Sequence, residues 1–322
     1  IGNPTRVNDK MLSFTYERRF ESHPAYTELW GIRKSIREMN GRIRKGSHIE
    51  RENIRNRISH LRDRATELEI LINEDLFSST RVVASTLVSS NHRILNGRRF
   101  STLFIDEAAQ ALEAACWIAI RKADRVIFAG DHCQLPPTIK CIEAARGGLD
   151  HTLMEKVVAN KPISVSLLKV QYRMNESIMR FPSEWFYNNQ LESAPEIRQR
   201  GILDFDTPMI WIDTSEMECH EEFVGESFGR INKPEANLLL QELESYIQKI
   251  GENRVLDEHI DFGLISPYKA QVQYLRNKIK SSSFFRRFRS LITVNTVDGF
   301  QGQERDVIFI SLVRANESGQ IG

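Results

Sequence analysis

The stretch TLFIDEAAQ, residues 102–110, decides the fold more than any other part of this chain. Its apolar residues at 103–105 predict a buried strand that ends in two adjacent carboxylates, Asp106 and Glu107. In open α/β sheets, ligands bind just beyond the carboxyl ends of the strands. Two carboxylates there suit a nucleoside triphosphate, because one can hold Mg²⁺ and the other can orient and deprotonate the attacking water. An ordinary strand followed by an acidic helix N-terminus explains the same letters, so both interpretations stay open.

Apolar strands alternate with helical stretches over the rest of the chain. The segment RVIFAGD, residues 125–131, is a second apolar run, which ends in Gly-Asp and continues as HCQLPPT. Strands are expected near 82–86, 102–106, 125–130, 164–170, 209–213, 262–266, 292–297 and 306–312, with helices at 149–158, 234–249 and 268–280. This alternation predicts mostly parallel, doubly wound sheets. The strands fall into two sets, before and after residue 165, which predicts two α/β lobes.

Composition excludes little. A length of 322 residues with 41% apolar residues is enough for about two domains. The 44 basic and 43 acidic residues nearly cancel, so evidence for nucleic acid has to be local. The four cysteines show no CxxC spacing, which disfavours zinc and fits a reducing compartment, cytoplasmic or nuclear. No apolar run approaches the roughly 18 residues of a membrane helix. The chain begins at Ile1 without Met and is expected to be an excised piece, so absent targeting signals carry little weight.

Residues 26–75 have a helical pattern of their own. Apolar residues recur at intervals of three and four from Leu29 to Ile43, and again from Ile54 to Ile72, with a Gly-Ser break at 46–47 between the two runs. This spacing predicts two helices zipped along narrow apolar seams as an antiparallel hairpin inserted in the first lobe. The break is flanked by six basic residues against two acidic ones: Arg42, Arg44, Lys45, Arg51, Arg55 and Arg57, with Glu50 and Glu52. A solvated face and a contact with a phosphate backbone both explain this basic tip.

Three segments of the second half place polar residues after predicted strands. In LKVQYRMNESIMRFPSEWFYNNQL, residues 168–191, Tyr172 and Arg173 follow a strand, and arginine suits bidentate contact with phosphate. For this segment alone, a surface Arg beside a packed Tyr is the more ordinary interpretation. GLISPYKAQVQYLRNKI, residues 263–279, carries Ser-Pro-Tyr at a strand end. ITVNTVDGFQGQERDVIFISLVRAN, residues 292–316, contains a tight GFQGQE loop whose glycines permit close backbone approach to a ligand.

Taken together, five segments in this order resemble the motif series of superfamily 1 helicases, most closely the senataxin and nonsense-mediated-decay branch. They are LFIDEAAQ, GDHCQLPPT, QYRMNESIMRFPSEWFY, LISPYKAQ and VNTVDGFQGQERDVI. The resemblance runs from about residue 80 to the C-terminus, roughly three quarters of the chain. It implies two RecA-like lobes, with ATP and Mg²⁺ bound in the cleft between them and single-stranded RNA or DNA across their top. It also implies a monomer.

The resemblance assigns a role to each matching residue. Asp106 would bind Mg²⁺ and Glu107 would activate water. Gln134 would sense the γ-phosphate, and Arg173 would act from the second lobe as an arginine finger.

Further roles are implied by the same motifs. Tyr172 would lie against the base, and Gly302 and Glu304 would meet the nucleotide from the second lobe. The residues matching positions that face nucleic acid are Thr86, Asn232, Pro267, Tyr268 and Thr296. The helical insert corresponds in place to a helical subdomain of the first lobe in this branch.

The family pattern also contains parts that the 322 residues lack. No G-x-x-x-x-G-K-[S/T] loop, which cradles phosphates with backbone amides and a lysine, is present. In the family this loop precedes the point where the chain begins, and a last motif with another Arg would lie beyond residue 322. We therefore expect residues 1–165 to be a partial first lobe with the helical insert and an exposed sheet edge, and residues 166–322 to be a truncated second lobe. The piece itself is expected to be inactive.

Three hypotheses compete to explain these motifs. The first is part of an ATP-dependent helicase or translocase. The second is a nucleic-acid-binding or scaffold protein on a degenerate helicase fold, without turnover. The presence together of Asp106, Glu107, Gln134 and Arg173 argues against such degeneration. A nucleotide kinase shares the strand-plus-Asp signal but leaves the second-half motifs unexplained.

Overall fold

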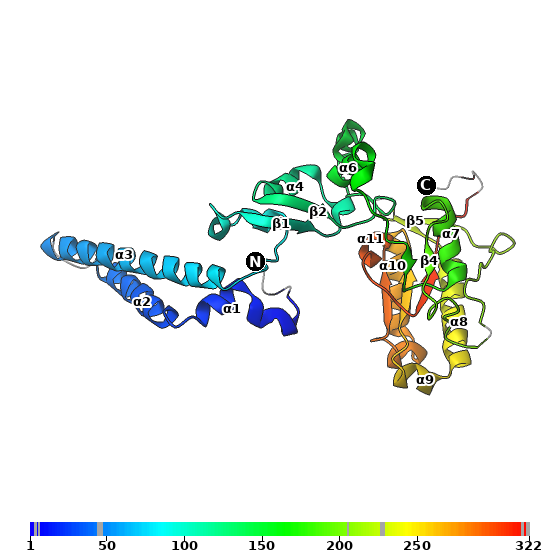
Figure 1. The fold of residues 1–322 in the computed structure, drawn as a ribbon. Coiled ribbons are helices and arrows are strands. Elements are labelled where there is room, and N and C mark those ends of the chain that lie inside the picture. The colour runs from blue at the N-terminus through cyan, green and yellow to red at the C-terminus, as the bar shows by residue number, and fades with distance from the viewer. Residues whose placement is uncertain are drawn as a thin grey trace. The chain divides into compact units, whose positions relative to one another are not determined.

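The computed structural model describes residues 1, 2, 5, 7–43, 48–204, 206–225, 229–316 and 319. By its internal contacts the chain divides into two compact units, Ile1–Val165 and Ser166–Gly322 (Figure 1). Among the described residues, the first unit contains two separate apolar clusters and the second unit one, so each unit is described by itself.

Three helices form the N-terminal part of the first unit: α1 (Tyr16–Glu21), α2 (Tyr26–Ile43) and α3 (His48–Ser78). Helices α2 and α3 lie side by side and are joined by the ion pairs Arg33–Glu69 at 2.6 Å and Arg64–Glu28 at 2.9 Å (Figure 1). The predicted seam residues Leu29, Ile58, Ala65, Leu68 and Ile72 are buried. The periodicity therefore located both helices, because a surface helix buries only the stripe that recurs every three to four residues.

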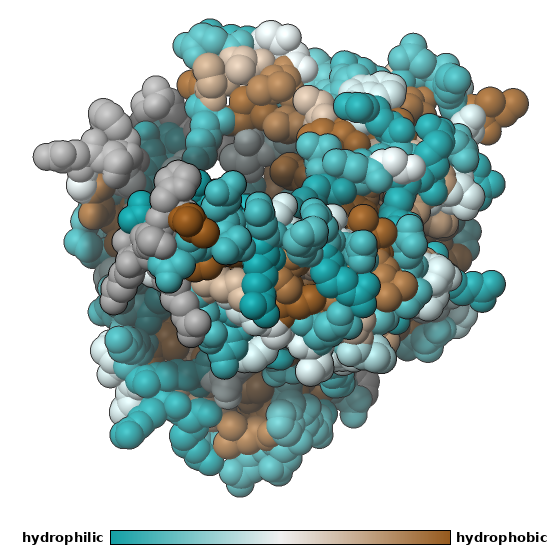
Figure 2. All heavy atoms as spheres, turned by 90° about the vertical axis from the view of Figure 1, so that its left-hand side faces the viewer, coloured by the Kyte–Doolittle hydropathy of each residue, from teal (hydrophilic) through white to brown (hydrophobic). Residues whose placement is uncertain are grey.

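The predicted basic tip is only partly described. Arg44, Lys45 and the Gly-Ser break at 46–47 lie outside the described residues, as does the side chain of Arg42. Arg51, Arg55 and Arg57 are exposed on α3. Figure 2 shows mainly hydrophilic side chains on the face nearest the viewer.

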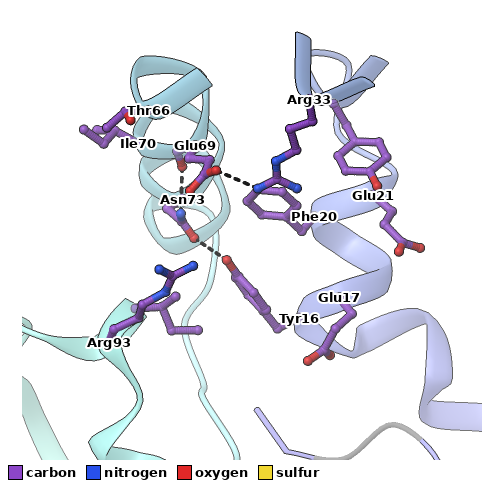
Figure 3. A pocket seen from close by; sticks show the side chains of 12 residues that line it. Tyr16, Glu17, Phe20, Glu21, Arg33, Thr66, Glu69, Ile70, Asn73 and Arg93 are labelled. Carbon is purple, nitrogen blue, oxygen red and sulfur yellow. Dashed lines mark hydrogen bonds and ion pairs between the residues drawn. The ribbon is translucent and has the colours of Figure 1, made fainter. Parts of the chain in front are cut away.

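Beside these helices lies a cavity of about 430 Å³, lined by residues of α1, α2, α3 and the short turn at 93–94. The Tyr16 hydroxyl donates a 2.9 Å hydrogen bond to Asn73 Oδ1, and Arg33 reaches Glu69 on the same wall (Figure 3). Burial raises the pKa of Tyr16, which keeps the phenol protonated as a donor. None of the predicted site residues lines this cavity.

The sheet of the first unit consists of β1 (Phe100–Ile105) and β2 (Ala123–Phe128), which are parallel with Ile105 opposite Phe128. Helix α4 (Glu113–Ile120) connects them, so β1, α4 and β2 form a β-α-β crossover. Helices α5 (Ile142–Ala144) and α6 (Leu153–Asn160) come next in the chain. The expectation of a buried run at 103–105 is wrong at Phe104, which is 68% exposed. Alternate residues of a strand point to opposite faces, and only one face of this pair packs against the core around Ile105.

The second unit is built on a three-stranded parallel sheet in the order β8-β7-β9. Its strands are β7 (Phe262–Ile265), β8 (Ile292–Asn295) and β9 (Val307–Ile310). The central strand β7 is buried, and helices α8 (Lys233–Ile250) and α10 (Lys269–Ser281) pack their apolar faces into the same core. Smaller elements are α7 (Glu176–Phe186), α9 (Glu252–Asp257), α11 (Val297–Phe300), the parallel pair β3 (Val170–Gln171) and β4 (Glu192–Ser193), and the antiparallel pair β5 (Glu222–Val224) and β6 (Gly229–Ile231).

Several predicted strands are absent or shorter. Residues 82–86 and 209–213 are not strands, and of 164–170 only Val170 pairs. A strand forms only where a neighbour supplies backbone donors and acceptors, and none pairs with these runs among the described residues. The fold is thus a mixture of helices with small, mostly parallel sheets, which is consistent with RecA-like lobes, and the sheets have fewer strands than the predicted doubly wound sheets. No helix in the described part of the chain is long and apolar enough to cross a membrane.

Candidate nucleotide and nucleic-acid site

The two carboxylates of the first unit lie directly beyond the end of β1. Asp106 and Glu107 are both exposed, and Glu107 has left-handed backbone angles of φ 51° and ψ 40°. Glu107 N donates to Asp106 Oδ1 at 3.0 Å, and Gln110 Nε2 donates to Glu107 Oε2 at 2.7 Å. A left-handed non-glycine residue is strained, and such residues cluster at functional sites. Both carboxylates are therefore held in a defined arrangement that solvent and a ligand can reach.

The end of β2 packs against this turn. Ala129 N donates to Ile105 O at 2.8 Å, and Ala108 N donates to Ala129 O at 2.9 Å, which extends the pairing past both strands. A Cβ at Gly130 would lie 2.9 Å from Ala108 N, so only glycine permits this approach. The segments at 106–108 and 130–132, more than twenty residues apart in sequence, therefore lie in contact in the structure.

Gln134 is oriented by the aspartate of the same loop. Its side-chain Nε2 donates to Asp131 Oδ2 at 2.9 Å, and its backbone N donates to Asp131 O at 3.1 Å. Asp131 Oδ1 accepts from Cys133 N at 3.0 Å, which closes the turn. Gln134 is exposed. The predicted γ-phosphate sensor therefore has its amide fixed by Asp131, a role that the motif alone did not assign.

In the second unit, two residues predicted separately form one ion pair. Arg173 Nε and Glu304 Oε2 are 2.9 Å apart, and their side chains are 60% and 70% exposed. Gln171 was missed, although it stands in the same QYR motif. Its Oε1 accepts from Arg173 N at 2.9 Å and from Met174 N at 2.7 Å, which fixes the loop that presents Arg173. Tyr172, beside it, is exposed.

The ends of β7 and β8 carry most of the remaining predicted residues. Ile265 lies opposite Asn295, and the two strands are parallel. The segments that follow β7 and β8 therefore leave the sheet at the same end. Pro267 is exposed, Tyr268 is half-buried with its hydroxyl 3.5 Å from Arg314 Nη1, and Thr296 caps α11 by accepting from Gly299 N at 3.3 Å. Gly302 is exposed on the next loop.

The last two predicted residues differ in accessibility. Thr86 lies in an exposed loop of the first unit, where its Oγ1 donates to Ser89 Oγ at 2.9 Å. Asn232 is 0% exposed. Its Oδ1 caps α8 by accepting from Glu235 N at 3.1 Å, and its Nδ2 donates to Cys219 O and Val313 O. The Asn232 side chain is thus part of the core, and its polar atoms are already occupied by backbone partners rather than presented to nucleic acid.

Acidic residues beyond parallel strands in one unit and a presented arginine in the other fit the class of nucleotide-hydrolysing helicases. Family models agree: one described as "AAA domain" matches residues 149–322, and a second with the same description matches residues 1–141. The chain belongs to this family, within the superfamily 1 helicases.

Similar curated proteins extend over nearly the whole chain. An uncharacterized ATP-dependent helicase of Methanocaldococcus jannaschii is 30% identical over 99% of this chain and 52% of its own length. The DNA-binding protein SMUBP-2 of Mesocricetus auratus is 33% identical over 100% of the chain and 33% of its own length. A regulator of nonsense transcripts 1 homolog of Drosophila melanogaster is 33% identical over 77% of the chain and 21% of its own length. The chain spans about half or less of these relatives.

Proposed function

We propose that this chain is the part of an ATP-dependent helicase or translocase that couples ATP hydrolysis between two lobes to movement along single-stranded nucleic acid. The observation that carries the proposal is the pair Asp106 and Glu107 at the end of β1, followed directly by Ala108, whose backbone contacts Ala129 and Gly130 where the turn to Gln134 begins. A degenerate scaffold has no need of a strained Glu107 beside an oriented Gln134.

The first unit supplies the groups for metal binding and proton transfer. Carboxylate oxygens are the ligands that Mg²⁺ prefers, and Asp106 offers them in an exposed position. When bound, Mg²⁺ neutralises charge on the phosphates. Glu107 orients a water molecule and accepts its proton, and the second N–H of the Gln134 amide, which Asp131 does not hold, donates to the γ-phosphate.

The second unit supplies the positive charge. Arg173 stabilises the charge that develops on the transferred phosphoryl group, which requires it to leave Glu304. An exposed ion pair contributes only about 0–1 kcal/mol, so this exchange is easily reversed. Tyr172, Gly302 and Glu304 then meet the nucleotide.

We assign residues 1–165 to a partial first RecA-like lobe, with α2 and α3 as an inserted antiparallel hairpin, and residues 166–322 to the second lobe. Thr86, Pro267, Tyr268 and Thr296 face single-stranded RNA or DNA. The basic tip adds sequence-independent contacts with phosphates. The protein acts as a monomer in the cytoplasm or nucleus.

Strand displacement tests the proposed function. The substrate is a duplex with a single-stranded tail, and the enzyme is a form of the protein that carries the phosphate-binding loop. Asp106→Asn should abolish ATP-dependent displacement, because an amide is a poor Mg²⁺ ligand. The matched control is Asp124→Asn, at the start of β2, where the carboxylate pairs with Arg99 on the surface and displacement should persist. Displacement by Asp106→Asn at the parent rate, or no displacement by the parent, would favour the scaffold hypothesis.

A further inference from the structure

The turn after β2 brings together three different metal-ligating side chains on consecutive residues. Ligand atoms of Asp131, His132 and Cys133 all lie within 4.8 Å of one another. They offer a carboxylate oxygen, an imidazole nitrogen and a sulfur. His132 is exposed, and the other two side chains are half-buried, so solvent and ions reach the cluster.

Two of the three ligands are held by the turn itself. Asp131 Oδ1 accepts from Cys133 N at 3.0 Å, and Gln134 N donates to Asp131 O at 3.1 Å. The preceding Gly130 packs against Ala108 N, which anchors the turn to the end of β1. The Asp131 carboxylate and the Cys133 backbone are therefore held in place, and rotation of the Cys133 and His132 side chains is enough to close the set.

The chemistry of this set selects a borderline-soft cation. Tetrahedral zinc with Zn–S near 2.3 Å and Zn–N near 2.0–2.1 Å separates neighbouring ligand atoms by roughly 3.5 Å, about 1 Å less than the upper limit here. Mg²⁺ prefers oxygen ligands in octahedral geometry, so a thiol and an imidazole discriminate against it. We propose that Asp131, His132 and Cys133 form a Zn²⁺ site with its fourth position open to water or a small ligand.

The sequence disfavoured zinc because it contains no CxxC spacing, and that criterion detects only sites built from closely spaced cysteines. A single thiol beside His and Asp escapes that signal. Binding replaces the proton of the Cys133 thiol by the metal and releases that proton to solvent.

The site has a consequence for Gln134. The carboxylate of Asp131 holds the Gln134 amide through Oδ2, 2.9 Å from Nε2. When Asp131 Oδ2 binds zinc, it no longer accepts the hydrogen bond from the Gln134 amide. Gln134, the predicted γ-phosphate sensor, then loses its fixed orientation. Zinc therefore inhibits ATP hydrolysis, and this consequence, unlike the binding itself, rests on the proposed function.

Cobalt spectroscopy tests the binding. Co²⁺ replaces Zn²⁺ at such sites, and a thiolate–Co²⁺ charge-transfer band reports the sulfur ligand. We expect the reduced, metal-free chain to show this band when Co²⁺ is added and to lose it when Zn²⁺, but not Mg²⁺, is then added. Cys133→Ser should remove the band, and His132→Ala should weaken Co²⁺ binding more than about tenfold, the smallest loss typical of removing even an outer partner of a metal site.

Cys141→Ser is the matched control, because Cys141 is an exposed thiol 3.2 Å from Glu143 and should leave the band intact. A band that survives Cys133→Ser, or its absence from the parent, overturns the site. Inhibition is tested separately in the form with the phosphate-binding loop, where Zn²⁺ should slow ATP hydrolysis by the parent and not by Cys133→Ser. An enzyme without ATPase activity that still shows the band would contradict the proposed function and leave the zinc site standing.

Discussion

Replacing Asn232 by alanine should destabilise the second unit more than any surface change. Asn232 is fully buried and makes three side-chain hydrogen bonds. Its Oδ1 caps the first turn of α8 at Glu235 N, and its Nδ2 satisfies the carbonyls of Cys219 and Val313, at 3.2 Å each. Alanine removes all three bonds and leaves the buried groups without partners.

The magnitude is set by these bonds. Loss of an N-cap costs about 1 kcal/mol. Each buried carbonyl deprived of its donor costs about 1–2 kcal/mol more, within the range for unsatisfied buried groups. The free energy of opening α8 should therefore fall by about 3–5 kcal/mol.

Native-state hydrogen exchange at the α8 amides measures this free energy within the second unit, without assuming that both units unfold together. The matched control is Asn277→Ala on the exposed face of α10, where Asn277 Oδ1 accepts a 3.1 Å hydrogen bond from Gln273. The control should change the free energy by less than about 0.5 kcal/mol. An Asn232→Ala effect below about 1 kcal/mol, or equal to that of the control, would refute the buried cap.

Three other predictions concern turnover and nucleic acid. The 322-residue chain should hydrolyse ATP negligibly, because it lacks the phosphate-binding loop, and steady-state turnover near one per second or faster would contradict this. In a form with that loop, Arg173→Ala should slow hydrolysis about 10³-fold or more, and parental hydrolysis by Arg173→Ala would make it a surface residue. Glu304→Gln removes the exposed ion pair with Arg173 and should change the stability by less than about 1 kcal/mol. Glutamine at four positions of the basic tip should lower the salt slope of single-strand binding by roughly 0.7 per lost contact, and an unchanged slope would mean a solvated face. The four positions are Arg42, Arg44, Lys45 and Arg51.

Local patterns predicted the elements whose partners are close in sequence. The heptad spacing located α2 and α3, and the apolar runs at 102–106 and 125–130 indicated the parallel pair with its connecting helix. The run at 209–213 looked equally strand-like, yet Met209, Ile210 and Trp211 are exposed and unpaired with any described strand. A local apolar run shows a preference for extended structure. A strand also needs a neighbouring strand to pair with, and the local sequence does not identify that neighbour.

The site shows the same division. The carboxylates beyond β1 were predicted from their place after a strand, but the Arg173–Glu304 pair spans 131 residues and has no local signature. The burial of Asn232 did have a local signature, because Asn followed by Pro234 and Glu235 is a pattern typical of a helix start. That pattern favours a helix cap, whereas the family motif favoured a contact with nucleic acid. The strained φ of Glu107 has no signal in composition or spacing.

One measurement tests the central claim that Glu107 activates water on ATP held by the first lobe. ATP binding and hydrolysis are compared for Glu107→Gln in the form with the phosphate-binding loop. The matched control is Glu113→Gln on α4, whose carboxylate pairs with Lys156. Glu107→Gln should bind ATP like the parent and fail to hydrolyse it, because the amide keeps the shape of the carboxylate but accepts no proton. Glu113→Gln should bind and hydrolyse ATP like the parent. Parental hydrolysis by Glu107→Gln would contradict the claim.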